Sequence, residues 1–397
     1  MTGWRSRLCS RSALLLALCA ASAGCAAGAA DDVSAPPGAP LPQLSQQELV
    51  RFTTGQTVFT RTFTPAEGLG PLFNETRCSN CHDLPTTGGT GAELVTKATR
   101  YVAGKCDLLE AEGGSNVQRH ATPLLVAAGI AREEIPRGAT AVSNIVPPSL
   151  YGLGLLEAVP DAAILARENP LGQGGDGVAG RAARTGDHRV GRFGRKAEFA
   201  TLAEFVEGAL LLEMGITTPH HLVEERVNGR PLPAGTDPAP DPEVGKSTVD
   251  ALVDFVRFLA PPLPESATGA VRDSITRGEQ QFRETGCSRC HVPTLVTSQN
   301  AVAALDRRTV HAYSDLLLHD LGPELASICG ADAAPSVWRT APLMGIRHRK
   351  VLLHDGRALS IDGAVRLHGG EAFKVKRAYE ALSSEQRTLL LRFVQSR

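Results

Sequence analysis

The sequence predicts a mainly α-helical protein in which one unit occurs twice, with long loops between the helices. The pattern Cys-x-x-Cys-His occurs at residues 78–82 and again at residues 287–291. Further segments echo each other in the same order behind the two copies, and each half ends in an amphipathic stretch. Such self-similarity indicates an internal duplication. The 40 glycines and 26 prolines among 397 residues predict many loops, so the interior needs an additional organising element.

The echoes define the elements that each half should contain. Residues 247–260 should form the helix that closes the first half, because Pro261 and Pro262 stop it. Residues 383–397 should close the second half, opened by serines that suit N-cap positions. Two upstream pairs also match: "VPPSLYGLGLLEAVP" (146–160) with "TAPLMGIRHRKVLLHDG" (340–356), and "ATLAEFVEGALLLEMG" (200–215) with "LSIDGAVRLHGGEA" (359–372).

Two phenylalanines and a linker complete the domain plan. Phe73 and Phe282 each lie five residues before the first cysteine of their motif, and we expect both on short helices. The linker-like stretch "PPLPESATG" follows Ala260, so we place the domain boundary there. The predicted domains are residues 46–265 and residues 266–397.

The N-terminus predicts export. Residues 1–25 carry three arginines, then a short apolar run and small residues, which is the layout of a signal peptide. The run is too short to span a bilayer. "ASAGC", ending at Cys25, resembles a bacterial lipoprotein processing site, so lipidation and ordinary cleavage both stay open. Residues 26–45 are expected to be a flexible tether, and the protein to be periplasmic, with an outer-membrane lipid anchor as the alternative form.

The overall charge argues against nucleic acid as a partner. The 41 Lys and Arg residues nearly balance 42 Asp and Glu residues, and no stripe of basic residues is present. An electrostatic footprint for a polyanion is therefore missing.

Three chemistries use a Cys-x-x-Cys motif, and the histidine separates them. Structural zinc needs four ligands, and neither copy has a second pair of ligands nearby. A thioredoxin-type redox pair needs no adjacent histidine. Covalent c-type haem uses every residue: two thiols add to the vinyl groups, and the imidazole binds iron. The two copies therefore predict two haems, held by Cys78, Cys81, His82, Cys287, Cys290 and His291. Each half then reads as a cytochrome c-like domain.

Two further cysteines lie outside these motifs. In an oxidising compartment Cys106 and Cys329 either pair as a disulfide or stay as two buried thiols, and the sequence leaves both open.

The sequence also resembles a known family. The segments "YGLGLLEAVP", "GRFGRKA", "LLLHDLGPELA", "WRTAPLMG", "LLHDGRA" and "HGGEA", together with both haem motifs, are similar to the dihaem oxidoreductase or putative peroxidase family. That family is related to bacterial dihaem cytochrome c peroxidases, and older labels call its members thiol oxidoreductases. The resemblance runs from about Gly55 to the C-terminus. It implies a periplasmic two-haem redox enzyme, in which one haem meets peroxide or another oxidant and the other stores or delivers electrons. For a peroxidase of this kind, a small cytochrome or cupredoxin is the expected electron donor.

The echoes assign roles to further residues. In related peroxidases a methionine follows the "HDG" segment as a sixth iron ligand, and here the matching residue is His368. His368 aligns with Ala209 in the first half, so we expect the first haem to keep an open position. Glu157 falls near the place of His354, and we predict that it moves a proton in peroxide cleavage.

Several alternatives stay open beside these roles. Met214 could fill the open position, His319 and His354 compete as ligands or neighbours of the second haem, and His120 is a weaker candidate beside the first haem. Trp338 is a core residue or a bridge between the haems. Arg192, Arg195 and Arg339 are candidate partners of haem propionates. Calcium in the loop around Asn169 and Asp176 is a further expectation from the resemblance.

Two other functions compete with the peroxidase. One is a plain electron-transfer cytochrome in which both haems have six ligands. The other is a thiol–disulfide oxidoreductase, against which the fixed histidine after each cysteine pair argues.

Overall fold

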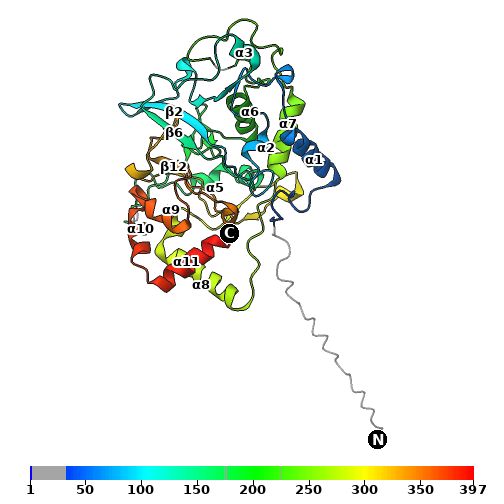
Figure 1. Ribbon diagram of the computed structural model, residues 1–397. Coiled ribbons are helices and arrows are strands. Elements are labelled where there is room, and N and C mark those ends of the chain that lie inside the picture. The colour runs from blue at the N-terminus through cyan, green and yellow to red at the C-terminus, as the bar shows by residue number, and fades with distance from the viewer. Residues whose placement is uncertain (2–32, 174, 176, 225) are drawn as a thin grey trace. The chain divides into compact units, whose positions relative to one another are not determined.

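The computed structural model describes Met1 and residues 33–173, 175, 177–224 and 226–397 (Figure 1). The predicted signal peptide (1–25), the lipidation site at Cys25 and residue Asp176 of the predicted calcium loop lie outside the described residues. Residues 33–397 form one compact unit.

Groups of helices and groups of short strands follow one another along the chain. The α-helices are α1 (Gln46–Thr60), α2 (Cys78–Cys81), α3 (Pro123–Ala127), α4 (Leu153–Glu157), α5 (Asp161–Leu165), α6 (Leu202–Met214), α7 (Lys246–Phe258), α8 (Gly269–Thr285), α9 (Ile361–Leu367), α10 (Phe373–Glu380) and α11 (Ser384–Gln395). The strands are β1 (Leu72–Phe73), β2 (Val95–Val102), β3 (Lys105–Asp107), β4 (Asn116–Val117), β5 (His120–Ala121), β6 (Ala141–Ile145), β7 (Ala183–Arg184), β8 (Val190–Gly191), β9 (Leu295–Val296), β10 (Thr309–Val310), β11 (Leu318–Asp320) and β12 (Val337–Arg339).

The prediction of a mainly α-helical protein is wrong. Of the described residues, 34% are helical and 15% lie in several small sheets. The largest sheet joins β3, β2 and β4, with β6 pairing antiparallel to β2 from Val95↔Ile145 to Thr99↔Ala141 (Figure 1). Strand β2 is rich in Val, Thr and Tyr, which favour extended backbone. This segment has no counterpart among the echoes, so the duplication argument gave no information about it.

Each half contains one pair of crossing helices. Helix α1 packs on α7 in the first half, and α8 packs on α11 in the second (Figure 1). A Cβ atom at Gly55 of α1 would collide with the Ala251 carbonyl oxygen, and one at Gly278 of α8 would collide with the Leu389 carbonyl oxygen. Both crossings therefore depend on a glycine at the point of closest approach. The predicted closing helices are confirmed, and Ser383 caps α11 as expected.

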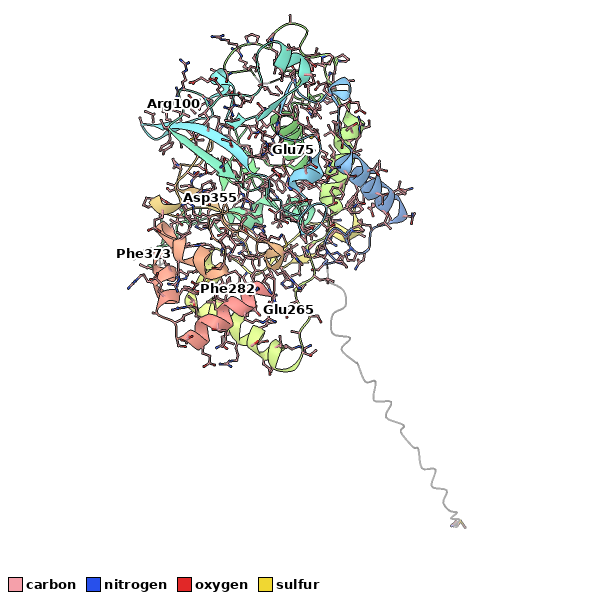
Figure 2. All side chains as sticks on the ribbon, in the orientation of Figure 1. Glu75, Arg100, Glu265, Phe282, Asp355 and Phe373 are labelled. Atoms are coloured by element: carbon pink, nitrogen blue, oxygen red, sulfur yellow. A yellow bond between two sulfur atoms is a disulfide. The ribbon has the colours of Figure 1, made fainter. Side chains whose placement is uncertain are left out.

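The phenylalanines follow the same duplication, with one correction. Phe282 lies on α8, beside α11, with its ring centroid 5.3 Å from that of Phe393 (Figure 2). Its counterpart is Phe59 on α1, four residues after the crossing glycine and 4.7 Å from Phe255. Phe73 instead lies on strand β1, so the helix predicted there is wrong. The chain between α1 and the first motif is longer than in the second half, which displaced the count of five residues.

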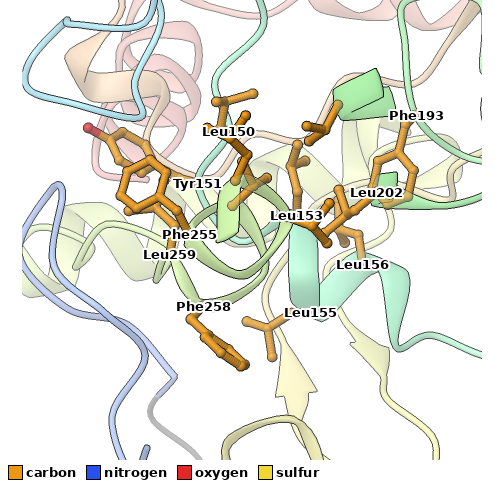
Figure 3. Packing of buried hydrophobic residues seen from close by; sticks show 14 of the residues in the cluster. Leu150, Tyr151, Leu153, Leu155, Leu156, Phe193, Leu202, Phe255, Phe258 and Leu259 are labelled. Atoms are coloured by element: carbon orange, nitrogen blue, oxygen red, sulfur yellow. The ribbon is translucent and has the colours of Figure 1, made fainter. Parts of the chain in front are cut away.

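One apolar core serves both halves. Leu155, Phe255 and Phe258 are among its buried members (Figure 3). Leu295 and Leu316, which lie beyond the predicted boundary, belong to the same cluster. A smaller cluster around Phe282 and Phe393 fills the space between α8 and α11. The boundary between residues 265 and 266 stays a prediction.

The described part of the expected tether is packed against the core. Val33, Ala35 and Leu41 are buried in the main cluster. The backbone N–H of Ala35 donates to the Pro261 carbonyl, and that of Leu41 donates to the Phe258 carbonyl. Apolar burial and backbone pairing fix this stretch.

A disulfide crosses the molecule. Cys106, next to β2 in β3, is bonded to Cys329, which lies between β11 and β12. This decides between the two alternatives that the sequence left open. Among the described helices, none combines the length and apolar character that a bilayer-spanning helix needs.

Candidate functional site

Each Cys-x-x-Cys-His motif opens onto its own cavity. The N-terminal cavity, of about 180 Å³, is lined by the first motif, by Phe59 and by residues of α6. The C-terminal cavity, of about 210 Å³, is lined by the second motif, by Phe282 and by residues of α9. The duplicated motifs therefore sit in matching surroundings, each with an aromatic ring of the crossing helix beside it.

The two motif histidines are held in the same way. His82 Nδ1 lies 3.0 Å from the Gly89 carbonyl oxygen, and His291 Nδ1 lies 3.0 Å from the Tyr313 carbonyl oxygen. This bond fixes the tautomer with the proton on Nδ1 and leaves Nε2 as a lone-pair donor. Burial lowers the pKa of His82, and it lowers the pKa of His291 to about 4. Both imidazoles are therefore neutral at pH 7, the form that binds a metal.

The motif cysteines are poorly suited to thiol exchange. Neither pair forms a disulfide, and burial raises the pKa of Cys78, Cys81 and Cys287 to about 12. Reactive thiols need a lowered pKa because the thiolate is the nucleophile. The surroundings thus favour sulfurs that are fixed in place over a pair that cycles between thiol and disulfide.

His368 lies where the sequence placed it, in the C-terminal cavity with His291. It directly follows α9, whose N-cap Ser360 accepts a hydrogen bond from the Gly363 N–H. His368 Nδ1 lies 2.8 Å from the Ala364 carbonyl oxygen, and burial lowers its pKa. The side chain therefore has the same arrangement as the motif histidines, with Nε2 left for the cavity.

The corresponding position in the N-terminal cavity is Ala209. Thr201 caps α6 as Ser360 caps α9, and Ala209 and His368 each lie eight residues beyond their cap. Ala209 lines the N-terminal cavity, where His82 is the one histidine among the described lining residues. The two cavities thus differ at an equivalent position, a histidine in one and a methyl group in the other.

His319 and His354 both line the C-terminal cavity, and His354 Nε2 is buried there without a hydrogen-bond partner among the described residues, so His354 stays open as a ligand. His319 is engaged elsewhere. His319 Nε2 lies 2.9 Å from Asp315, and Nδ1 lies 2.7 Å from Glu371. Burial alone would lower the pKa of His319, but these bonds and a contact with Cys290 outweigh it and raise the pKa to about 12. An imidazolium has no lone pair for iron, so the described contacts make His319 a charged neighbour of the second motif.

The remaining candidates from the sequence lie in different places. Glu157 is not among the lining residues: its carboxylate pairs with Arg257 at 2.9 Å and accepts the Leu202 N–H at 2.8 Å. The proton-transfer role of Glu157 stays a prediction. Met214 is buried and lines the N-terminal cavity, so its thioether stays available as an alternative ligand. His120 lies on β5 and lines neither cavity.

Sequence reasoning missed the carboxylates that do line the N-terminal cavity. Glu213 lies on α6 four residues after Ala209, and its Oε2 accepts a hydrogen bond of 2.8 Å from Asn74. Residues four apart share a helix face, so this spacing could have identified it. Glu75 and Glu198 also line the cavity.

Three arginines meet between the two cavities. Arg195 lines both cavities, and Arg339 and Arg349 line the C-terminal one. All three also line a small hollow between them. Burial and mutual repulsion lower the pKa of Arg195 to about 9, and burial lowers those of Arg339 and Arg349 to about 10. Among the described residues, backbone carbonyls accept hydrogen bonds from Arg195 and Arg339, and none of the three guanidinium groups has a carboxylate ion pair. The Nε atoms of Arg195 and Arg349 have no hydrogen-bond partner there.

Such a cluster calls for anions from outside the chain. Buried cations are costly unless they are paired, and a guanidinium group matches a carboxylate with two parallel bonds. Haem carries two propionate carboxylates on the ring edge away from its vinyl groups. The buried donors, the neutral histidines and the paired cysteines therefore fit two haems. Arg192, by contrast, is occupied by the carbonyls of Leu156, Glu157 and Val159 and by Asp161.

In the described part of the predicted calcium loop, the side chain of Asn169 bonds to the backbone of the loop itself. The side-chain amide of Asn169 donates to the carbonyls of Gln173 and Val178, while its Oδ1 accepts the Gln173 N–H. These bonds close the loop with its own backbone. Calcium stays a prediction.

Two matching histidine-bearing cavities with arginines between them define a two-haem redox protein. Residues 139–397 match the family described as "Di-haem oxidoreductase, putative peroxidase", and the chain belongs to this family. The predicted family membership is therefore confirmed. No curated protein matches the sequence.

The solved structures that match this chain are distant in sequence and have TM-scores below 0.5. Hydrazine synthase of Kuenenia stuttgartiensis is 11% identical, with a TM-score of 0.41 over 99% of this chain and 100% of its own. A MauG-like protein associated with microbial copper homeostasis is 12% identical, with a TM-score of 0.40 over 92% of this chain and 93% of its own. A diheme peroxidase of Burkholderia thailandensis is 14% identical, with a TM-score of 0.32 over 91% of this chain and 94% of its own.

Proposed function

We propose that this protein is an exported dihaem c-type cytochrome that reduces hydrogen peroxide at its N-terminal haem and takes electrons in through its C-terminal haem. The observation that carries the proposal is the difference between Ala209 and His368 at equivalent positions. Iron held by two histidines is closed to substrate, whereas iron held by one histidine keeps a position for peroxide.

The chain supplies the holding groups. Cys78 and Cys81 would bind one haem through thioethers, with His82 as iron ligand, and the second motif would repeat this arrangement. When bound, haem iron supplies the one-electron chemistry that amino-acid side chains do not. The arginines between the cavities would neutralise the propionates.

Proton handling would fall to a carboxylate of the N-terminal cavity. Reduction of one peroxide to two water molecules consumes two electrons and two protons. Glu213 is the best-placed candidate, because it shares a helix face with Ala209 and Asn74 holds one of its oxygens. Among the described residues, no hydrogen bond engages the other oxygen, so it could accept a proton and return it. Glu157 is the competing prediction, and it is separated from the cavity by its ion pair with Arg257.

Trp338 is positioned for electron transfer between the cavities. Its side chain lines the C-terminal cavity and packs against Ile145 and Ile328. Those two residues line the N-terminal cavity. The indole ring thus lines one cavity and packs against two residues that line the other.

Export is supported by the disulfide. Cys106 and Cys329 are bonded, and such bonds form and persist outside the reducing cytosol. Together with the signal-like first 25 residues, this favours a periplasmic protein that receives electrons from a small cytochrome or cupredoxin. Anchoring through a lipid on Cys25 is the alternative to a free periplasmic form.

The test exchanges the residues that distinguish the cavities. In the haem-loaded protein, Ala209→His should close the N-terminal haem, abolish the high-spin signal and lower peroxide turnover by about 100-fold or more. His368→Ala should convert one low-spin haem to a form that binds cyanide, and should leave the other spectrum unchanged. Wild type with two low-spin haems that ignore cyanide in every redox state would contradict the proposal.

Two further variants sharpen the proton assignment. Glu213→Gln should lower peroxide turnover by about 100-fold while leaving both haem spectra intact. Glu157→Gln should mainly reduce stability. If Glu157→Gln loses turnover and Glu213→Gln does not, the carboxylate predicted from the sequence is the correct one.

A plain electron carrier is the second candidate function, and Met214 favours it. This buried methionine lines the N-terminal cavity, and a thioether could close that iron as well. Met214→Leu should leave the spectrum of the peroxidase unchanged. A shift from low to high spin in Met214→Leu would instead support the electron carrier.

A further inference from the structure

Trp338 is enclosed by charged and aromatic groups on both faces. The Nζ atom of Lys196 lies 3.4 Å from the centre of the indole ring. The imidazole of His354 is stacked on the ring, with centroids 3.9 Å apart and planes at 16°. Two groups this close to one ring centre cannot share a face, so the indole is sandwiched between them.

Lys196 is held over the ring as an ammonium ion. Its Nζ donates to the carbonyls of Ala334, Pro335 and Val337 at 3.1, 3.0 and 2.7 Å. Three acceptors use three N–H donors, and only the protonated amine has three. The side chain is 2% exposed, so little water screens its charge. Burial lowers the pKa of Lys196 to about 7, and the charges of Glu198 and Asp320 only partly offset this effect. The ammonium form is therefore assigned from the three carbonyl acceptors that surround Nζ.

The indole also lacks a base. Trp338 Nε1–H donates to the Leu325 carbonyl oxygen at 2.9 Å. A backbone carbonyl is too weak a base to take the proton that an oxidised indole releases. Loss of one electron would therefore leave a radical cation beside the Lys196 ammonium, with no nearby acceptor for the proton on Nε1.

We propose that Lys196 keeps Trp338 from being oxidised, so that electrons pass between the haems through the indole without leaving a radical on it. The inference rests on the proposed peroxidase function for the direction of electron flow, but the effect of Lys196 on the indole does not depend on peroxide. A cation on the ring face stabilises the neutral indole and repels the charge of its oxidised form.

The proposal matters when the electron donor is exhausted. Two electrons are still needed for each peroxide reduced to two water molecules, and the protein must then supply them from its own side chains. Trp338 is the one tryptophan beyond the first 32 residues, and it lies between the cavities. Without the charge of Lys196, the indole would give up one electron and, more slowly, its Nε1 proton.

The experiment compares variants that separate charge from structure. Haem-loaded wild type, Lys196→Gln, Lys196→Met and Lys196→Arg are treated with peroxide and no donor. Freeze-quenched samples are examined by EPR for an indole radical, and the peptide containing Trp338 is weighed for added oxygen. Wild type and Lys196→Arg should keep Trp338 intact, whereas both uncharged variants should accumulate about tenfold more oxidised Trp338. A merely structural lysine would lower the melting temperature without changing this ratio.

A second oxidant separates this inference from the proposed function. Photogenerated tris(bipyridine)ruthenium(III) removes one electron from indoles without any peroxide chemistry. If peroxide is not turned over but ruthenium still oxidises Trp338 only in the uncharged variants, the peroxidase proposal fails and the role of Lys196 stands. A Trp338 radical in wild type, or equal oxidation in wild type and both uncharged variants, would overturn the role of Lys196.

Discussion

The N-terminal and C-terminal cavities share the features that surround the Cys-x-x-Cys-His motif and differ at one equivalent lining position. Both have a glycine at a helix crossing, a phenylalanine one turn later, and a motif histidine bonded to a carbonyl. The ring centroids of Phe59 and His82 are 6.2 Å apart, and those of Phe282 and His291 are 6.4 Å apart. The difference lies at Ala209 and His368. The two halves thus share the motif residues that would hold a cofactor, and they differ in the residue at the position of Ala209 and His368.

Removal of one cysteine pair should produce the largest effect. In a host that matures c-type cytochromes, Cys78→Ala with Cys81→Ala should lower the mass by one haem and abolish peroxide turnover. Cys287→Ala with Cys290→Ala should remove the other haem and slow electron delivery. Intact-mass measurement and absorption spectra check both. Loss of both haems from either variant would mean that the two sites do not load independently.

Substitution of His319, which has no counterpart in the first half, should produce the next largest effect, a loss of stability. His319→Gln leaves the buried Asp315 and Glu371 without their cation, so the free energy of unfolding should fall by about 3–5 kcal/mol. Thermal melting of the haem-loaded protein measures it. As a matched control, the partly exposed His348, which forms no ion pair in the described part of the chain, should tolerate the same change within about 0.5 kcal/mol.

The pH dependence has a definite sign. The pKa of His319 is raised to about 12 in the folded protein, so its stabilising contribution is complete below about pH 6.5, the ordinary pKa of histidine. The contribution is then lost as the pH rises toward the folded pKa, by about 1.4 kcal/mol per pH unit. Wild type should therefore lose stability between pH 7 and 9 more steeply than His319→Gln. Parallel curves would contradict the assignment.

The crossing glycines should give equal and smaller effects in the two halves. Gly55→Ala and Gly278→Ala each push a methyl group against a carbonyl oxygen of the facing helix, so each should cost about 1–3 kcal/mol of stability. Chemical denaturation measures both. A strong effect in one half only would show that the two crossings are not equivalent.

The helix caps should give the smallest effect and a spectral contrast. Thr201→Ala and Ser360→Ala each remove one cap hydrogen bond and should cost about 1 kcal/mol. Only Ser360→Ala should also broaden the spectrum of the C-terminal haem, because His368 ends the helix that Ser360 begins. The same spectral change in Thr201→Ala would argue against an open N-terminal haem.

The sequence predicted what the duplication repeats. Both motifs, both closing helices and the pairing of Ala209 with His368 could be found because each half served as a template for the other. The sheet around β2 and β6 could not, since the second half has no copy of it. Phe73 was misplaced for the same reason, because an extended connection after α1 shifted the count.

Contacts between residues that are distant in the chain could not be predicted from the sequence either. Glu157 was chosen by alignment with His354, but its ion pair with Arg257 depends on how α4 packs on α7. Lys196 and Trp338 are far apart in the chain and meet only in the fold. Arg349 was overlooked because nothing local marks it, whereas its neighbours Arg195 and Arg339 had been noted in the quoted motifs. A single sequence carries no signal for such contacts.

The bond between Cys106 and Cys329 has a consequence for the integrity of the protein. It closes a covalent ring over a sequence separation of 223 residues. A protease that cuts the backbone once inside this ring opens the loop but releases no fragment. After such a cut, the two pieces stay joined by the disulfide and by the apolar core that they share. A molecule that has been cut once can therefore keep its two cavities in place.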